Sequence, residues 1–206
     1  MDTKLPTQQN AGEVTQPPVL KKNPKEKSGG TWEVVKFFVL AAIIVIPIRM
    51  YIAQPFIVSG ASMDTTFASG EYLIVDEISY RFIDPERGDV IIFRSPQDPS
   101  QYFIKRIIAL PGETIRIAGN GNAPIIINAE NLDGFLLNEP YTSSRRDGFL
   151  TRTLGNEEYF VMGDNRAASS DSRVWGPVER DLIIGRAFFR LFPVAKASIL
   201  PGEYRQ

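Results

Sequence analysis

The sequence predicts a mainly β domain preceded by one membrane-spanning helix. Three observations support this expectation: an apolar segment near the N-terminus, seven strand-like runs after residue 56, and turn-forming residues between those runs. We expect residues 1–31 to form a disordered cytoplasmic tail, residues 32–53 a transmembrane helix and residues 54–206 an extracytoplasmic, β-rich domain.

The N-terminal segments are justified by composition. Residues 1–30 are polar and rich in lysine and proline, without apolar periodicity, which is typical of disorder. The uncharged stretch from Phe37 to Ile48 grows to about 20 residues when Lys36 and Arg49 are counted as snorkelling ends, enough to cross a bilayer. A buried core helix is the alternative, but the segment is apolar on all sides and follows a polar tail.

Charge predicts the orientation of this helix. Four lysines (21, 22, 25, 27) precede it, whereas no Lys or Arg occurs between Arg49 and Arg81. The positive-inside rule then places the tail in the cytoplasm and the main domain outside. A cleaved signal peptide is disfavoured by the long leading tail and by the lack of an A-x-A pattern after the apolar run. We therefore expect a single-pass protein of the plasma membrane, with the lipid bilayer as a partner.

The β domain is predicted from apolar or alternating runs separated by turns. These runs cover residues 72–76, 88–94, 102–110, 114–118, 123–128, 158–163 and 182–192. Turn signals such as Asp84-Pro85, Pro111-Gly112 and Gly163-Asp164-Asn165 lie between them. Residues 129–157 are polar and irregular, so we expect a long loop or a hairpin extension there.

Composition excludes several chemistries. The chain has 206 residues and a net charge of −1, which gives no case for nucleic acid. It contains no cysteine and no histidine, so thiol nucleophiles, Ser-His-Asp catalysis and most zinc sites are excluded. A hydrolase of this composition needs Lys, Asp, Glu, Tyr or a metal-bound water as its general base. We expect no cofactor and no metal.

Three stretches contain candidate catalytic groups. In FIVSGASMDTTF (56–67), small neighbours would let a carbonyl approach Ser62, although an ordinary Ser/Gly turn has the same composition. In YFIKRIIALPG (102–112), strand alternation places Lys105 between Phe103 and Ile107, where burial would lower its pKa unless it snorkels to solvent. The third stretch is GDNRAASSDSRVWGP (163–177). It forms either a solvated loop or a loop folded onto the core, in which Asp171 and Arg173 make an ion pair.

The N-terminal span is followed, in this order, by the motifs SGASM, GDVIIFR, YFIKRIIALPGE and GDNRAASSDSRVWGPV. In these motifs and their order, the chain resembles the type I signal peptidases over residues 33–195. These are membrane-bound serine proteases with a Ser-Lys dyad, and the resemblance implies their all-β catalytic fold. It also implies preproteins as partners and cleavage after an Ala-x-Ala-like sequence.

The resemblance implies roles for individual residues. Ser62 matches the nucleophile and Lys105 the general base. Ser169 matches the serine that hydrogen-bonds the lysine amine. The supporting positions are the ion pair Asp171 and Arg173, together with Asp164 and Arg106. Candidates for the walls of the substrate pocket are Phe56, Val58, Met63, Phe67, Phe103 and Ile104.

The chain also departs from the family pattern. Asp64, Thr65 and Thr66 follow Met63 where the family usually has Pro-Thr-Leu, and Gly60 occupies a position that is serine in many members. One rival hypothesis is a self-cleaving Ser-Lys repressor, which would need a DNA-binding domain and no span. Another is a non-catalytic, membrane-anchored β domain that binds partners.

Overall fold

The computed structural model describes residues 1, 30–51, 53–119, 123–144 and 148–204. The chain divides into two units, Met1–Leu40 and Ala41–Gln206. The tail expected at residues 1–31 lies outside the described residues, apart from Met1, Gly30 and Thr31, and the last two are helical rather than part of a tail.

Helix α1 spans Gly30–Tyr51, so it begins and ends two residues earlier than expected. The 16 residues from Thr31 to Ile46 contain no glycine or proline, which favours a helix, and Glu33 lies in the first turn, where a negative charge is stabilising. Large apolar side chains from Val34 to Ile46 are exposed to solvent. Contrary to the expectation for residues 32–53, no helix in the described part of the chain is both long enough and apolar enough to cross a membrane.

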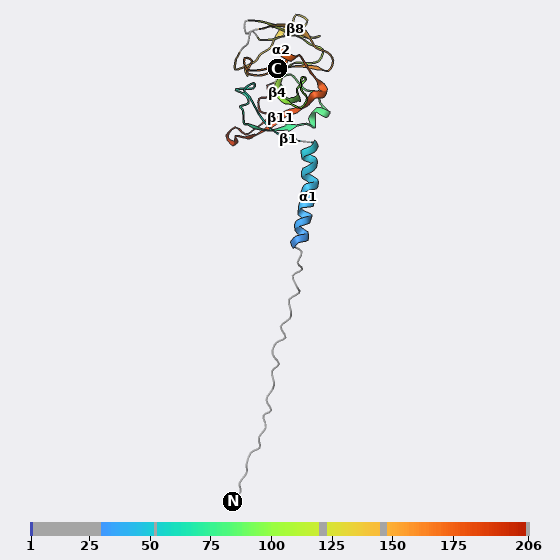
Figure 1. Ribbon diagram of the computed structural model, residues 1–206, viewed down its shortest axis with the longest axis vertical. Helices are drawn as coiled ribbons and strands as arrows, with labels where there is room; N and C mark the ends of the chain where they lie inside the picture. The colour runs from blue at the N-terminus through green and yellow to red at the C-terminus, as the bar shows by residue number, and fades with distance from the viewer. Residues whose placement is uncertain (2–29, 52, 120–122, 145–147, 205–206) are drawn as a thin grey trace. The chain divides into compact units, whose positions relative to one another are not determined.

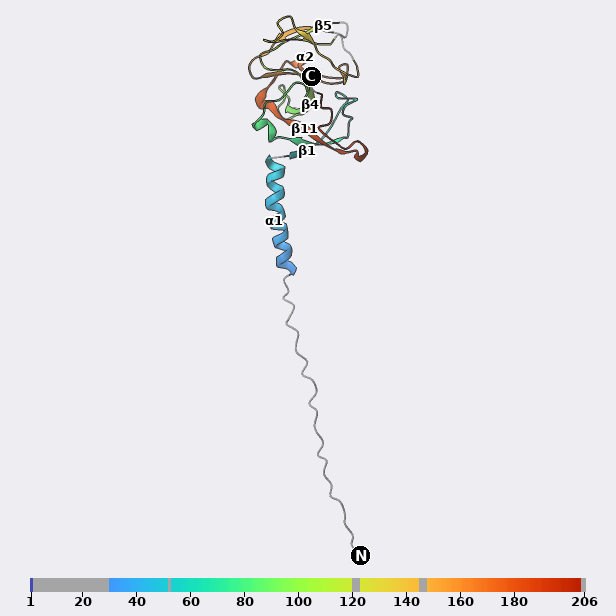
Figure 2. The same cartoon turned by 180° about the vertical axis from the view of Figure 1, so that it is seen from behind.

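The rest of the chain is mainly β, as predicted. The larger sheet has eight strands in the order β1-β2-β11-β3-β4-β9-β10, with β12 paired to β11, and the smaller sheet has the order β7-β6-β5-β8. The strand pairings within the two sheets of the described residues are antiparallel, and Figures 1 and 2 show the small sheet at one end of this domain and β1 and β11 towards the other.

The strand bounds match most of the predicted runs. The large sheet contains β1 (Ala53–Ile57), β2 (Tyr72–Asp76), β3 (Val90–Arg94), β4 (Tyr102–Ala109), β9 (Glu158–Met162), β10 (Val178–Glu179), β11 (Ile183–Phe192) and β12 (Ser198–Ile199). The small sheet contains β5 (Thr114–Ala118), β6 (Ile125–Ile127), β7 (Phe135–Leu136) and β8 (Phe149–Thr153). Short helical turns are η1 (Ser79–Arg81), α2 (Ser172–Trp175), η2 (Arg180–Leu182) and η3 (Val194–Lys196).

Strand β4 positions the site because it lies inside the large sheet, between β3 and β9. Apolar side chains cover both of its faces, so burial is almost continuous from Lys105 to Ala109 instead of alternating with exposure. Strand geometry still sends Lys105 and Arg106 to opposite faces. Two adjacent cations are therefore buried in two separate environments of one strand.

Candidate active site

Ser62 lies in the turn that joins β1 to β2. Val58 and Gly70 close this turn, since the Gly70 N–H donates to the Val58 carbonyl at 2.9 Å. Gly60 has φ of +91°, a backbone conformation that other residues rarely adopt. Met63 and Phe67, which are 1% and 0% exposed, fix the turn by packing into the core beneath it. The Ser62 side chain itself remains half-buried at the surface of the turn.

Lys105 reaches this turn from β4. Its Nζ lies 2.9 Å from Ser62 Oγ and 2.8 Å from the Ile104 carbonyl oxygen, and both atoms accept hydrogen bonds from the amine. The side chain is 4% exposed, and Nζ lies 5.5 Å from the centre of the Phe103 ring. A half-buried hydroxyl and a buried amine are thus in direct contact, although 43 positions separate them in the chain.

Burial lowers the pKa of Lys105 to about 8. The low-polarity surroundings disfavour the charged ammonium, whereas the negative charges of Asp171 and Asp164 act in the opposite sense. Burial is the larger effect. A substantial fraction of the amine is therefore neutral near pH 8, and a neutral amine can accept the Ser62 proton.

Asp171 and Arg173 form the ion pair expected from the sequence. Arg173 Nε and Nη2 each donate to one carboxylate oxygen of Asp171 at 2.8 Å. The Gly163 N–H also donates to Asp171 at 3.1 Å, and Asp171 caps the short helix α2. Burial raises the pKa of Asp171, but the hydrogen bonds and charge of Arg173 outweigh it and hold the pKa below its usual range. This carboxylate therefore stays ionised.

A second ion pair lies on the other face of β4. The guanidinium of Arg106 binds both carboxylate oxygens of Asp164 at 2.8 and 2.6 Å, and neither side chain is more than 1% exposed. Arg106 also donates to the Gly88 and Gly202 carbonyls, while Thr66 Oγ1 donates to Asp164 at 2.5 Å. This pair ties β4 to the turn that carries Ser62.

Ser169 is buried near the dyad but does not hydrogen-bond Lys105. Its Oγ has no hydrogen-bond partner of normal geometry among the described residues. The segment approaches Ser62 closely at Gly163, where an added Cβ would lie 2.4 Å from both Ser169 Oγ and the Ser62 carbonyl oxygen. Only glycine therefore allows this approach.

A cleft of about 280 Å³ runs beside the dyad. Four of the six predicted pocket residues line it: Phe56, Val58, Phe103 and Ile104. Met63 and Phe67, the other two, are buried in the core beside the turn and are not among the residues that line the cleft. They follow Ser62 in a tight turn, and their packing into the core holds this turn in place.

Other residues of this region escaped the sequence interpretation. The cleft is also lined by Ile57, Leu73, Ile92, Tyr102, Ala168 and Ser170. Arg190 on β11 donates to the Thr66 carbonyl at 2.6 Å and lies 3.1 Å from Glu71, at 9% exposure. The sequence FFRLF places Arg190 between apolar residues, as YFIKRII does for Lys105. The same pattern could therefore have identified Arg190 from the sequence.

Comparisons with known proteins agree with these observations. The family model described as "Signal peptidase, peptidase S26" matches residues 31–192. The "Probable signal peptidase I-2" of Synechocystis sp. is 36% identical over 190 residues, covering 89% of this chain and 82% of that protein. The "Signal peptidase I" of Leptolyngbya laminosa is 37% identical over 182 residues, covering 84% of this chain and 86% of that protein.

A solved structure is also similar. The crystal structure of a signal peptidase I from Enterococcus faecalis V583 shares 30% sequence identity, with a TM-score of 0.42. The match covers 50% of this chain and 97% of that one.

Proposed function

Because the chain belongs to the signal peptidase family S26 and is a serine endopeptidase of the signal peptidase I type, we propose that it cleaves signal peptides from exported preproteins after small residues, using a Ser62–Lys105 dyad. The contact of 2.9 Å between Lys105 Nζ and Ser62 Oγ is the observation that supports this proposal most directly. The chain has no histidine that could serve as the base.

The reaction starts with proton transfer. Neutral Lys105 takes the Ser62 proton as Ser62 Oγ attacks the scissile carbonyl carbon. The oxyanion that forms is held by the backbone N–H of Ser62, which has no hydrogen-bond partner within the described ranges. The carbon–nitrogen bond then breaks, and the lysine ammonium gives its proton to the leaving amine. A water molecule, deprotonated by the same lysine, hydrolyses the acyl ester and frees Ser62.

The neighbouring polar groups support the lysine in this scheme. Ser169 is buried, and its hydroxyl interacts with the Asp171 carboxylate, which leaves its oxygen suited to accept a hydrogen bond from the ammonium that forms during the reaction. Asp171 and Asp164 stabilise the same ammonium by their charge. Arg173 and Arg106 hold the two carboxylates in place.

The cleft supports a preference for small side chains. An extended peptide would place several of its residues in this volume of about 280 Å³, which leaves little space for each side chain. The large apolar side chains of Phe56, Tyr102 and Phe103 form its walls. Phe56 and Tyr102 pack edge to face at 5.5 Å, which closes one side. Bulk of this kind excludes large side chains sterically.

The proposed location is a membrane surface. The apolar side chains exposed on α1, such as Phe37, Phe38 and Ile43, support its insertion into lipid as an anchor. The bias of lysines towards its N-terminal side supports a cytoplasmic N-terminus and an extracytoplasmic catalytic domain.

The proposal is tested by incubating the purified chain in lipid nanodiscs with a preprotein and sequencing the new N-terminus. We expect one new N-terminus immediately after an Ala-x-Ala-like sequence with the native chain. We expect none with Ser62→Ala or Lys105→Ala, because the two groups act as a unit. Cleavage by both variants at the native rate would contradict the dyad, and no cleavage by the native chain would contradict the function.

A further inference from the structure

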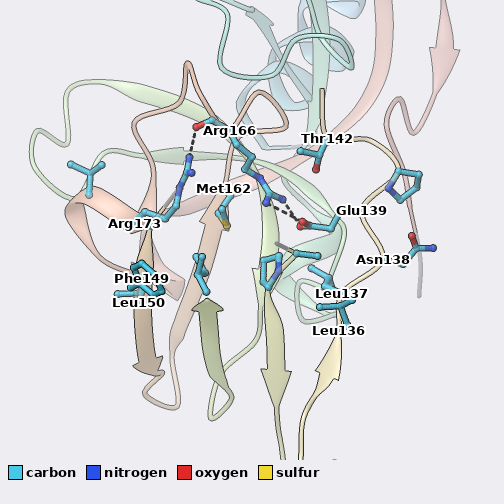
Figure 3. A pocket seen from close by; sticks show the side chains of 16 residues that line it. Leu136, Leu137, Asn138, Glu139, Thr142, Phe149, Leu150, Met162, Arg166 and Arg173 are labelled. Atoms are coloured by element: carbon cyan, nitrogen blue, oxygen red, sulfur yellow. Dashed lines mark hydrogen bonds and ion pairs between the residues drawn. The ribbon is translucent and has the colours of Figure 1, made fainter. Parts of the chain in front are cut away.

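A second, larger cavity lies away from the dyad, in the region of the small sheet. Its volume is about 510 Å³, within the range of sites that bind small molecules. Figure 3 shows its lining side chains: Phe149 and Leu150 lie on the left, Leu136 and Leu137 lie on the right below Glu139, and Met162 and Arg166 lie between the two groups. The proposed peptidase reaction uses none of this space.

The walls are apolar inside and also at the rim. Leu137 and Met162 are each 2% exposed and belong to the core between the two sheets, which stops short of filling this space. At the rim, Leu136, Phe149 and Val174 are 65%, 84% and 61% exposed, respectively. Large apolar side chains held in solvent around an apolar cavity are typical of a surface that receives a ligand.

The charges that line the cavity are already compensated. Arg166 forms an ion pair with Glu139, and Arg173 forms one with Asp171. A second anion here would lie close to two carboxylates, at a cost in electrostatic repulsion. The lining therefore favours an uncharged ligand.

Two polar groups of the lining remain for such a ligand: Arg173 Nη1 and the Thr142 hydroxyl, whose buried Oγ1 has no hydrogen-bond partner among the described residues. Arg173 uses Nε and Nη2 for Asp171 and for the Arg166 carbonyl. Its Nη1 donates to no residue in the described part of the chain, and Arg173 lines the cavity. A guanidinium N–H is a donor only, so its partner must be an acceptor.

We propose that this cavity is a binding site for a small uncharged molecule with an apolar body and one carbonyl group, and that Arg173 donates to that carbonyl. The apolar body lies against Leu137, Leu150 and Met162. This assignment does not rest on Ser62 or Lys105, and it shares Arg173 with the support of the proposed peptidase site.

Methionine methyl groups give a direct test. In the full chain labelled with [methyl-13C]methionine and held in lipid nanodiscs, Met162 reports on the cavity and Met63 on the core beneath the Ser62 turn. Hexan-2-one is the probe, and hexanoate is the charged comparator with the same number of carbons. We expect hexan-2-one to shift the Met162 resonance saturably and leave Met63 unmoved, and hexanoate to bind at least ten-fold more weakly.

Variants make the test specific. Leu150→Trp fills the cavity and Val174→Trp covers its rim, so both should abolish the shift, with retained peptidase activity showing that each variant is folded. Leu132→Trp is the matched control, because Leu132 is 80% exposed and does not line the cavity. No saturable shift at Met162, an equal shift at Met63, an unchanged shift in both filled variants, or equal binding of hexanoate would each overturn the proposal.

Discussion

At the scale of single residues, the protonation of Lys105 connects structure with reaction. Its ordinary pKa of 10.5 falls to about 8 because the side chain is buried, despite the charges of Asp171 and Asp164. The base acts only after losing its proton, so the rate should follow the neutral fraction. A histidine base would already be neutral at pH 7.5.

The first prediction is the pH profile. We expect kcat/KM for a preprotein to rise about ten-fold per pH unit below pH 7, and to level off above about pH 8. Lys105→Arg should be inactive throughout, because a guanidinium keeps its proton in this range. Steady-state rates from pH 5.5 to 10 provide the measurement. A profile that is flat from pH 5.5 upward would instead indicate a carboxylate base.

The second prediction concerns the stability cost of the same lysine. Its pKa is lower in the folded state than in the unfolded state, so the unfolded chain binds the proton more tightly between about pH 8 and 10.5. The free energy of unfolding therefore increases as the pH rises through that window. Below it, the buried charge of Lys105 makes the folded state less stable. Lys105→Met should unfold with a free energy about 1–3 kcal/mol higher than the native chain at pH 7.

The check is urea denaturation at pH 7 and pH 10. The difference between Lys105→Met and the native chain should shrink at the higher pH, where the lysine is neutral in the folded state. A lower stability of Lys105→Met at pH 7 would mean that the contacts of Nζ with Ser62 and Ile104 outweigh the cost of burial.

The third prediction concerns the fully buried pair Arg106–Asp164. Asp164→Asn removes the charge but keeps the shape, leaving the guanidinium buried without a counter-ion. We expect the free energy of unfolding to fall by about 3–5 kcal/mol. Asp133→Asn, at an exposed position, should change it little. Equal urea midpoints for the two variants would contradict the role given to this pair.

At the scale of elements, strand β11 supports the nucleophile turn from a distance in the sequence. Arg190 contacts the Thr66 carbonyl, Glu71 and the face of the Phe67 ring, whose centre lies 4.8 Å away. All three belong to the segment that follows Ser62. We infer that Arg190 is a positioning residue that holds this turn against β11.

The fourth prediction tests that role. Arg190→Met should lower kcat roughly 10- to 100-fold with little change in KM, because a small displacement of the nucleophile is costly. Arg190→Lys should recover only part of the rate, since an ammonium lacks the planar fork of donors. Arg186→Met is the control on the same strand, where Arg186 pairs loosely with Asp76 at 3.6 Å. Equal kcat values for Arg190→Met and Arg186→Met would remove the positioning role.

Elements also show where the sequence interpretation was limited. The seven predicted runs correspond to strands, because alternation and β-branched residues are local signals. Residues 129–157 were expected to form a long loop or a hairpin extension, without strand bounds, and they contain β7 and β8. β7 has two residues and β8 reads FLTRT with most side chains exposed, so neither has a period that stands out from a polar loop. Pairing with β6 and β5 makes them strands.

At the scale of the whole molecule, the proposed function requires the dyad to meet a substrate at a membrane. Ser62 lies 11 positions after the end of α1 at Tyr51. At about 3.4 Å per residue, the intervening chain spans at most ~37 Å. The proposed anchor would therefore keep the nucleophile near the bilayer, where a signal peptide's cleavage site emerges.

The fifth prediction is the topology. Protease added outside spheroplasts should digest the domain after residue 56 and spare the lysine-rich N-terminal segment, as the charge bias across α1 requires. Antibodies against each end of the chain would follow the two parts. A digested N-terminal segment with a protected domain would invert the proposed orientation.

The sequence by itself determined most of the strands and limited the possible type of chemistry. The lack of histidine, the serine in SGASM and the lysine flanked by Phe103 and Ile107 are local facts, but strand alternation left open whether the amine is buried or snorkels to solvent. Only the tertiary structure decided which distant groups meet. Lys105 touches Ser62, Ser169 misses the amine, and Met63 and Phe67 pack inward, because these outcomes depend on the order of strands in the sheet and on the path of a turn. Sequence periodicity specifies the face of a strand but not its neighbour.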